Sequence, residues 1–223
     1  MDLTSYFNSL PKIDLLYNKY ATFSHFNGNP YRLITGYEVF KNSELDPFMR
    51  QFVVDQGKCI VMPNMLNSEV IGFVVRSISQ KQFRNYTKCN YIPYGAGVNN
   101  KQFYQPWIIV ESALDSDFLR TFYPFVIAIN SVSVSANYLN FIKGTCSTCY
   151  CAFDNDDAGE NAFRNLCYKH SGKDFHIKRL RPPISLDGKP LKDFGEILDC
   201  LHNCNIEDYN YYTSVIKCLM LNV

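Results

Sequence analysis

The chain has 223 residues and a mass of 25.8 kDa, which suits one large domain or two small ones. Hydrophobic residues make up 47% of it and charged residues 19%, which excludes an intrinsically disordered chain and a polyelectrolyte tail. Its 22 basic and 21 acidic side chains give a net charge of +1, which taken alone argues against a nucleic-acid-binding protein.

The sequence contains no run of the roughly 18 apolar residues that a membrane-spanning helix needs. Its first residues also lack the basic-then-apolar order of a secretory signal. Nine cysteines occur without framework spacing, which favours free thiols in a reducing compartment. We therefore expect a cytoplasmic protein with no membrane partner.

In the first half of the chain the hydrophobic pattern is irregular, and we predict an α+β subdomain over residues 1–105. Two apolar runs separated by turn residues predict neighbouring strands. The elements expected in this half are strands at Cys59–Pro63 and Val70–Arg76, and turns at 27–30, 64–69 and 94–97.

From Pro106 onward, short apolar runs alternate with helical patterns, which indicates βαβ units around a mainly parallel sheet. The expected strands are Trp107–Val110, Phe125–Ile129, Cys149–Phe153 and Phe175–Leu180. The expected helices are Asp115–Phe122, a helix capped by Ser135 that runs to Lys143, Asp157–Lys169 and one that begins at Asp193. We assign residues 106–203 to this α/β domain and 204–223 to a last helix that begins at Ile206.

Three cysteines at the third predicted strand, Cys146, Cys149 and Cys151, could suggest a metal knuckle. No second Cys or His pair follows at zinc-site spacing, and alternate residues of a strand point to opposite faces. We interpret them as small apolar side chains buried in the core.

Carboxylates follow the predicted strands of the second half. Glu111 comes after the first strand, Asp154 and Asp156 after the third, and Asp193 after the fourth. Functional groups of open parallel sheets gather beyond the carboxyl ends of the strands, and oxygen-only ligands favour Mg²⁺ or Mn²⁺. Helix N-capping is the alternative, because Asp154 and Asp156 also precede a helix. Spacing alone leaves both interpretations open.

Three motifs resemble the Toprim domain of DnaG-type primases, topoisomerases and related nucleases. Residues 110–115, V-E-S-A-L-D, are similar to its V-E-G-x-x-D, and residues 153–159, F-D-N-D-D-A-G, match its D-x-D-x-A-G. Residues 192–196, K-D-F-G-E, resemble the K-D-x-x-E of bacterial and phage primases. Two features depart from the family pattern: Ser112 replaces a glycine, and Asn130–Ser133 replace a glycine-rich turn.

Upstream, Ile60–Pro63 and Val70–Ile78, with Gly72 and Arg76, resemble a segment of DnaG-type polymerase domains. Topoisomerases and the small ribosomal-RNA maturation nucleases share only the Toprim part with primases. The resemblance therefore favours a primase, and it extends from Cys59 to Leu201.

The resemblance implies a DNA primase core, a nucleotidyltransferase that synthesises short RNA primers on single-stranded DNA from ribonucleoside triphosphates with Mg²⁺ or Mn²⁺. Asp154, Asp156 and Asp193 would hold the metal. Glu111 would be a further ligand or the general base. Asp115 is a secondary candidate that could instead cap its helix. Lys192 would face incoming phosphates or pair with Asp193.

Template binding needs positive charge and stacking faces. The segment from 76 to 101 contains no acid, four interleaved aromatics (Phe83, Tyr86, Tyr91 and Tyr94) and five bases, namely Arg76, Lys81, Arg84, Lys88 and Lys101. It is our predicted template and nucleotide surface, with a solvated loop packed by aromatics as the alternative. Residues 1–105 carry 11 basic and 7 acidic side chains and the rest 11 and 14, so near-neutrality conceals a basic and an acidic half.

A smaller basic cluster, Lys178, Arg179 and Arg181, lies along the predicted fourth strand. Two of its members could line the same face, but an ordinary edge-strand charge pattern explains them nearly as well. The sequence shows no zinc-ribbon motif of the kind that DnaG-type primases use to read template. Either the chain is a fragment, or another protein, a zinc-bearing partner or a replicative helicase, supplies the missing functions. The small size, the missing accessory domains and the Asn/Tyr/Phe-rich composition favour a phage or mobile-element origin. The alternative functions are a Toprim nuclease and a catalytically degenerate module that binds DNA or a replisome partner.

Overall fold

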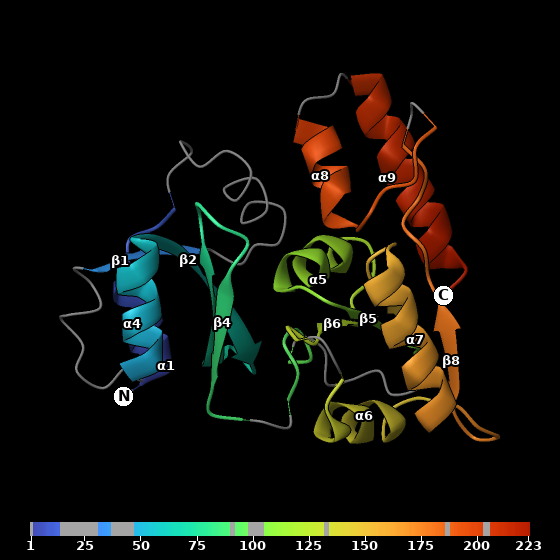
Figure 1. Cartoon of the computed structure of the whole chain (residues 1–223), viewed down its shortest axis with the longest axis horizontal. Helices are drawn as coiled ribbons and strands as arrows, with labels where there is room; N and C mark the ends of the chain where they lie inside the picture. The colour runs from blue at the N-terminus through green and yellow to red at the C-terminus, as the bar shows by residue number, and fades with distance from the viewer. Residues whose placement is uncertain are drawn as a thin grey trace. The chain divides into compact units, whose positions relative to one another are not determined.

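The computed structural model describes residues 2–13, 31–36, 47–89, 92–97, 105–131, 134–185, 188–202 and 206–223. The chain forms two compact units, residues 1–90 and 91–223 (Figure 1). No helix in the described ranges is both long and apolar enough to cross a membrane.

The first unit is built on an antiparallel sheet with strand order β1-β2-β3-β4. Its strands are β1 (Arg32–Thr35), β2 (Lys58–Leu66), β3 (Glu69–Ser77) and β4 (Phe83–Thr87), and its helices are α1 (Leu3–Ser9) and α4 (Pro47–Gln56). The two predicted strands are confirmed as β2 and β3, which pair across a tight turn at Asn67 and Ser68. Both turn residues have positive φ, 50° and 70°, which suits the twist of a two-residue hairpin.

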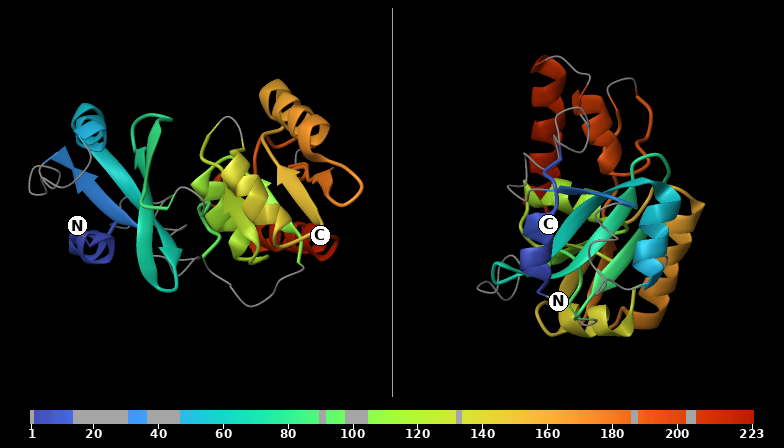
Figure 2. Two further views of the ribbon diagram at one scale, coloured as in Figure 1. Left: turned by 90° about the horizontal axis from the view of Figure 1, so that it is seen from below. Right: turned by 90° about the vertical axis from the view of Figure 1, so that its left-hand side faces the viewer.

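One face of this sheet carries the core of the first unit. Phe7 of α1 and Phe52 and Val53 of α4 pack with Phe73 and Val75 of β3 in one buried cluster. Figure 2 shows both helices against the sheet. The helices and strands β1 and β4 were not predicted from the sequence, and the predicted turn at 27–30 lies outside the described residues.

The second unit contains a parallel sheet with strand order β6-β5-β7-β8. Its strands are β5 (Trp107–Val110), β6 (Val126–Ala128), β7 (Thr148–Ala152) and β8 (His176–Arg179). Its helices are α5 (Ala113–Arg120), α6 (Ala136–Lys143), α7 (Asp157–His170), α8 (Gly195–His202) and α9 (Ile206–Leu221). The predicted α/β domain with a parallel sheet is therefore confirmed, as is the α+β character of the preceding half.

Helices cover both faces of the parallel sheet (Figure 1), with α5 on one side and α6 and α7 on the other. Because both faces are covered, Ile108 and Ile109 of β5 are each fully buried, and the strand is a continuous apolar run. Cys149 and Cys151 of β7 are also fully buried in the core, as predicted. Ser135 accepts a hydrogen bond from the Tyr138 amide and caps α6, as predicted.

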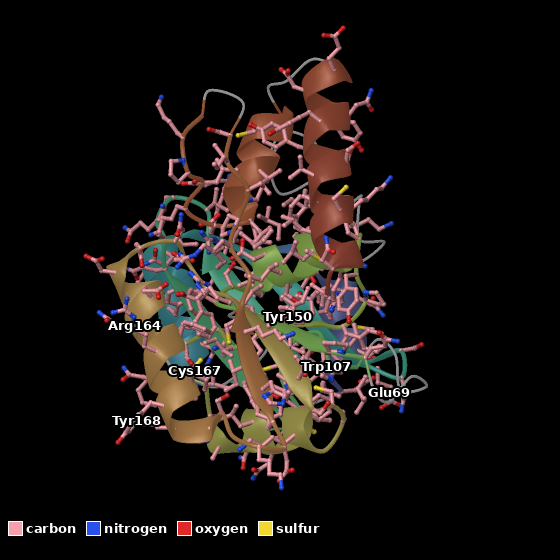
Figure 3. The ribbon with its side chains drawn as sticks, turned by 90° about the vertical axis from the view of Figure 1, so that its right-hand side faces the viewer. Glu69, Trp107, Tyr150, Arg164, Cys167 and Tyr168 are labelled. Carbon is pink, nitrogen blue, oxygen red and sulfur yellow. The ribbon has the colours of Figure 1, made fainter. Side chains whose placement is uncertain are left out.

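Helix α7 presents different faces to the sheet and to solvent. Figure 3 shows Arg164 and Tyr168 pointing outward from α7, and Tyr168 is 91% exposed. Leu166 is buried in the core, and the Cys167 thiol lies 3.8 Å from the Ile177 carbonyl oxygen of β8. The helix is thus fixed over β7 and β8, and this places its N-terminus at the carboxyl edge of the sheet.

Candidate active site

Glu111 and Asp154 meet because their strands are parallel neighbours. Val110 of β5 pairs with Ala152 of β7, so the residues that follow leave the sheet at the same edge. The Asp154 backbone N–H donates to Glu111 Oε1 over 3.0 Å. Both side chains are partly buried, and the hydrogen bond fixes the Glu111 carboxylate beside the loop after β7.

Asp156 has two roles, one for each carboxylate oxygen. Oδ1 accepts the Gly159 backbone N–H at 2.9 Å and so caps α7. Oδ2 lies 3.1 Å from the Lys192 ammonium. N-capping and membership of the acidic site were alternative predictions, and Asp156 has both features at once.

Lys192 bridges the two aspartates of the D-x-D motif. Its Nζ lies 3.2 Å from Asp154 Oδ2 and 3.1 Å from Asp156 Oδ2. The sequence had suggested pairing with Asp193, whereas the ammonium pairs with these two side chains. Their hydrogen bonds and charges raise the pKa of Lys192 above its ordinary value.

The acidic side chains differ in charge environment. Burial raises the pKa of Glu111, and the negative charges of Asp154 and Asp156 raise it further. Burial also raises the pKa of Asp154, although Lys192 opposes the shift. The Gly159 N–H and Lys192 lower the pKa of Asp156, which therefore holds its negative charge more readily than the other two.

The side chains of Asp193 and Asp115 both lie close to Gly195. Asp193 Oδ1 accepts the Glu196 backbone N–H at 2.7 Å, while Glu196 Oε2 accepts the Lys192 N–H at 2.6 Å, a reciprocal cap at the start of α8. Asp115 is 6% exposed and accepts the Ser112 hydroxyl proton at 2.7 Å. Burial, with the charge of Asp193, raises the pKa of Asp115 to about 7.

The two departures from the Toprim pattern fit the backbone. Ser112 has a φ of −116° and caps α5 by accepting from the Asp115 N–H, so no glycine is needed there. Asn130 has a φ of +47°, a left-handed conformation that asparagine tolerates better than most residues. Its N–H donates to the Glu111 carbonyl oxygen at 3.0 Å. The backbone thus accommodates Ser112 after β5 and Asn130 after β6 without glycine.

Arg179 supports the site from the neighbouring strand. Its guanidinium is 9% exposed and donates to the carbonyl oxygens of Cys151, Phe153 and Asp154 at 2.9–3.0 Å. Sequence reasoning placed Arg179 in a surface charge cluster and missed this role, because it depends on the pairing of β8 with β7. The Arg179 guanidinium therefore holds both the end of β7 and the loop that carries Asp154.

Its two companions in the predicted cluster also have local partners. Arg181 donates to Asn155 Oδ1 at 2.9 Å and pairs with Glu160 at 3.0 Å. The Lys178 ammonium lies over the Tyr150 ring, 5.5 Å from its centroid.

Gly159 is required by the close approach of α7 to Asp154. A Cβ atom at this position would lie 2.1 Å from the Asp154 carbonyl oxygen. Only glycine lets the helix N-terminus come this near to the D-x-D loop. The glycine of the motif therefore has a packing reason.

A cavity of about 280 Å³ adjoins Glu111 on the side of α7. Its apolar lining includes Ile129, Phe153 and Leu166, and its polar lining includes Asn165 and Lys169. Cavities at the carboxyl edge of a parallel sheet are the usual ligand sites of such folds.

The predicted basic surface is a β-hairpin in the first unit, with Arg76 on β3 and Arg84 on β4. Val75 pairs with Arg84 and Arg76 with Phe83, so the two arginines lie on opposite faces of the sheet. The Arg84 guanidinium lies 5.4 Å from the centroid of the Phe52 ring. The Arg76 Nε is buried and has no hydrogen-bond partner in the described part of the chain. Lys81 and Lys88 are exposed in the flanking turns, and Lys101 lies outside the described residues.

The side chains at the strand ends offer oxygen donors to a divalent cation. Within the described residues, no three acidic, His or Cys side chains are grouped as a ready metal site. Two carboxylates with substrate phosphates suffice for Mg²⁺, however, and Asp154 and Asp156 already share one cation, the Lys192 ammonium. The residues present therefore fit Mg²⁺ or Mn²⁺ in their chemistry.

Residues 108–198 match a family model described as Toprim-like. With the parallel sheet and the acids at its carboxyl edge, this match shows that the second unit contains a Toprim-like domain. No curated protein matches the sequence.

Solved primases share the fold of the chain. The primase of Aquifex aeolicus, with its zinc-binding and RNA polymerase domains, is 16% identical with a TM-score of 0.59, over 94% of this chain and 57% of that one. The E. coli primase catalytic core is 15% identical with a TM-score of 0.53, over 93% and 74%. The primase fragment of the bacteriophage T7 primase-helicase is 13% identical with a TM-score of 0.53, over 86% and 70%. The chain thus has the fold of DnaG-type primase catalytic cores.

Proposed function

We propose that this chain is the catalytic core of a DNA primase, which joins ribonucleoside triphosphates into a short RNA on single-stranded DNA. The observation that carries the proposal is the convergence of Glu111, Asp154 and Asp156 at one strand edge, in a chain whose likeness to primase cores covers both units. A likeness confined to the Toprim-like domain would fit a nuclease equally well.

Asp154 and Asp156, with substrate phosphates, would hold Mg²⁺ or Mn²⁺, which when bound neutralises charge on the triphosphate and on the attacking 3′-oxygen. Asp193, which caps α8, would be a further ligand. Glu111 is suited to accept the proton of the 3′-hydroxyl, because burial raises its pKa toward neutrality. Its hydrogen bond from the Asp154 N–H keeps the carboxylate oriented. Lys192, which is 46% exposed, can turn toward the phosphates.

We propose that the hairpin β3–β4 contributes to template binding through Arg76, Lys81 and Lys88. Arg76 is the member that lies within a strand, where it pairs with Phe83 of β4. A DnaG catalytic domain with the same fold has been solved bound to single-stranded DNA. Arg84 lies on the opposite sheet face from Arg76, so a strand on one face meets only one of them.

The cavity beside Glu111 would take the nucleoside part of one substrate. Its volume of about 280 Å³ and its apolar walls suit a planar base, and Asn165 offers a donor and an acceptor to the base edge. A Leu166→Trp substitution would fill the cavity and should raise the KM for nucleotides while leaving DNA binding unchanged.

The experiment that tests the function incubates the chain with single-stranded DNA, Mg²⁺ or Mn²⁺ and labelled ribonucleotides. We expect short RNA products, lost with Asp154→Asn or Asp156→Asn and kept with Asp157→Asn. Asp157 is a suitable control because it is exposed in the first turn of α7, next to Asp156.

Other outcomes identify the alternatives. Shortened DNA in the absence of nucleotides would indicate a Toprim nuclease. DNA binding without either product would indicate a degenerate module, unless a zinc-bearing primase partner or a replicative helicase restores synthesis.

A further inference from the structure

The Lys192 ammonium lies where the two aspartates of the D-x-D motif direct their oxygens. It is 3.2 Å from Asp154 Oδ2 and 3.1 Å from Asp156 Oδ2, close enough for two charge-assisted hydrogen bonds. Among the residues that the structure describes, Lys192 is the basic side chain that pairs with both. Arg179 instead donates to backbone carbonyl oxygens.

The backbone around Lys192 is fixed to the D-x-D loop. The Asn155 backbone N–H donates to the Lys192 carbonyl oxygen, and the Asn155 side chain donates to the Leu191 carbonyl oxygen at 3.4 Å. The Lys192 N–H is held by Glu196 at 2.6 Å. The Cα of Lys192 therefore has a set position beside the acids, and the placement of its ammonium follows from the fold.

The side chain itself can leave. It is 46% exposed, and a lysine stem has four rotatable bonds, so the ammonium can move into solvent while the backbone stays in place. In its present position it neutralises part of the repulsion between Asp154, Asp156 and Glu111. A cation that enters this site must compete with it.

We propose that Lys192 is an exchangeable internal counter-cation, which occupies the Asp154 and Asp156 oxygens until a divalent metal displaces it. This inference rests on the proposed function. The displaced ammonium remains tethered beside the site, where a triphosphate gives it a new partner. Metal and nucleotide then favour each other's binding. The metal replaces the positive charge that Lys192 takes away from the aspartates, and the triphosphate replaces the anionic partner that Lys192 loses. Metal alone binds weakly, and the loaded site forms when substrate is present.

Metal binding without nucleotide or DNA tests this directly. Free Mn²⁺ is measured by electron paramagnetic resonance during titration of the full chain, with Asp156→Asn to locate the site. We expect Lys192→Gln to bind Mn²⁺ about tenfold more tightly than the unmodified chain, because the competitor is gone. Lys192→Arg, which keeps the charge, should stay within about twofold.

Lys189→Gln is the matched control, since it removes the same charge from an exposed position of the same loop. Equal or weaker Mn²⁺ binding by Lys192→Gln overturns the proposal. So does an equal gain in Lys189→Gln, which would reveal a general charge effect. Absence of Mn²⁺ binding in every variant also overturns it.

A second measurement follows Lys192 itself. Amine acetylation, quantified by peptide mass spectrometry, should modify Lys192 several times faster when Mg²⁺ is saturating, while Lys189 is unchanged. An unchanged Lys192 rate contradicts displacement.

Neither test uses nucleotide, so the two proposals fail separately. If the chain is inactive but gives the expected result in both tests, only the proposed function is refuted. If the chain makes primers but Lys192→Gln does not change its affinity for Mn²⁺, only the proposed exchange of Lys192 for metal is refuted.

Discussion

The two units of the chain each contain a four-stranded sheet, but they distribute charged side chains in opposite ways. In the parallel sheet, β5 and β7 end at one edge, and Glu111 and Asp154 meet there over a 3.0 Å hydrogen bond. In the antiparallel sheet, Arg76 and Arg84 belong to paired strands, yet they lie on opposite faces.

The difference has a simple geometric cause. Parallel strands bring the residues that follow them to the same edge, whatever the spacing along the chain. Antiparallel strands assign each residue to a face by its register, so two residues with suitable chemistry can be separated by a shift of one. The parallel unit can therefore concentrate charge, and the antiparallel unit spreads it.

The largest expected effect comes from the cation that holds the parallel edge together. Arg179→Met removes the guanidinium donor of the Phe153 and Asp154 carbonyl oxygens and one of the two donors of the Cys151 carbonyl oxygen, which keeps the Leu180 N–H. We expect a loss of about 3–5 kcal/mol in the free energy of unfolding. The measurement is urea unfolding followed by fluorescence of Trp107, the single tryptophan of the chain, which reports on the second unit.

Arg181→Gln is the control for this prediction, because the Arg181 side chain is 55% exposed and should contribute less than about 1 kcal/mol. If both variants unfold at the same urea concentration, the buried guanidinium does not hold this edge.

A smaller loss is expected from Gly159→Ala, which tests how closely α7 must approach the edge. The added methyl group would lie 2.1 Å from the Asp154 carbonyl oxygen, so the helix or the loop must shift, at about 3 kcal/mol. Gly172→Ala is matched to it, since no atom lies within 4 Å of a Cβ at that position. Equal stability of the two variants would contradict the packing argument.

The comparison also explains what the sequence could predict. The strands of the parallel sheet were all predicted within two residues. The signal is strongest for β5 and β6, because burial on both faces makes them uninterrupted apolar runs. Strand β4, with the sequence F-R-N-Y-T and no fully buried residue, gives no such signal and was interpreted as part of a basic loop. Helix α4 was missed as well, since its apolar residues include the exposed Phe48.

In the site, the motif residues Glu111, Asp154 and Asp156 were predictable, because position after a strand decides where they lie. The contacts of Lys192 and Arg179 were not. Lys192 reaches the aspartates because Asn155 hydrogen-bonds to Leu191, a residue 36 positions further along the chain. The contacts of Arg179 depend on the register in which β8 pairs with β7, which places Arg179 opposite Cys151. Neither contact leaves a periodic pattern in the sequence.

The charge crowding of the parallel unit predicts a pH dependence. Burial raises the pKa of Asp115 to about 7 from an unfolded value near 4, so folding disfavours its charged form. Stability should be greatest below pH 4 as far as this group is concerned and should fall as the pH rises to about 7. Asp115→Asn should abolish this contribution and gain about 1–3 kcal/mol over the unmodified chain at pH 8, with little gain at pH 4.

Urea unfolding by Trp107 fluorescence in a metal chelator measures this difference, and the exposed Asp174→Asn is its control. A gain that is the same at pH 4 and pH 8 would show that packing, and not charge, causes it.

The smallest expected effect tests the antiparallel unit. Because Arg76 and Arg84 lie on opposite faces, Arg76→Ala should weaken binding of single-stranded DNA about five- to tenfold and reduce its salt dependence by about one ion. Arg84→Ala removes the same charge. Because the Arg84 guanidinium lies over the Phe52 ring, however, this substitution should change the affinity for DNA less than about twofold. Fluorescence anisotropy at several salt concentrations distinguishes them. Equal losses of affinity would mean that DNA contacts both faces of the hairpin. The DNA strand would then pass around the edge of the sheet and bring Arg76 and Arg84 into one binding site.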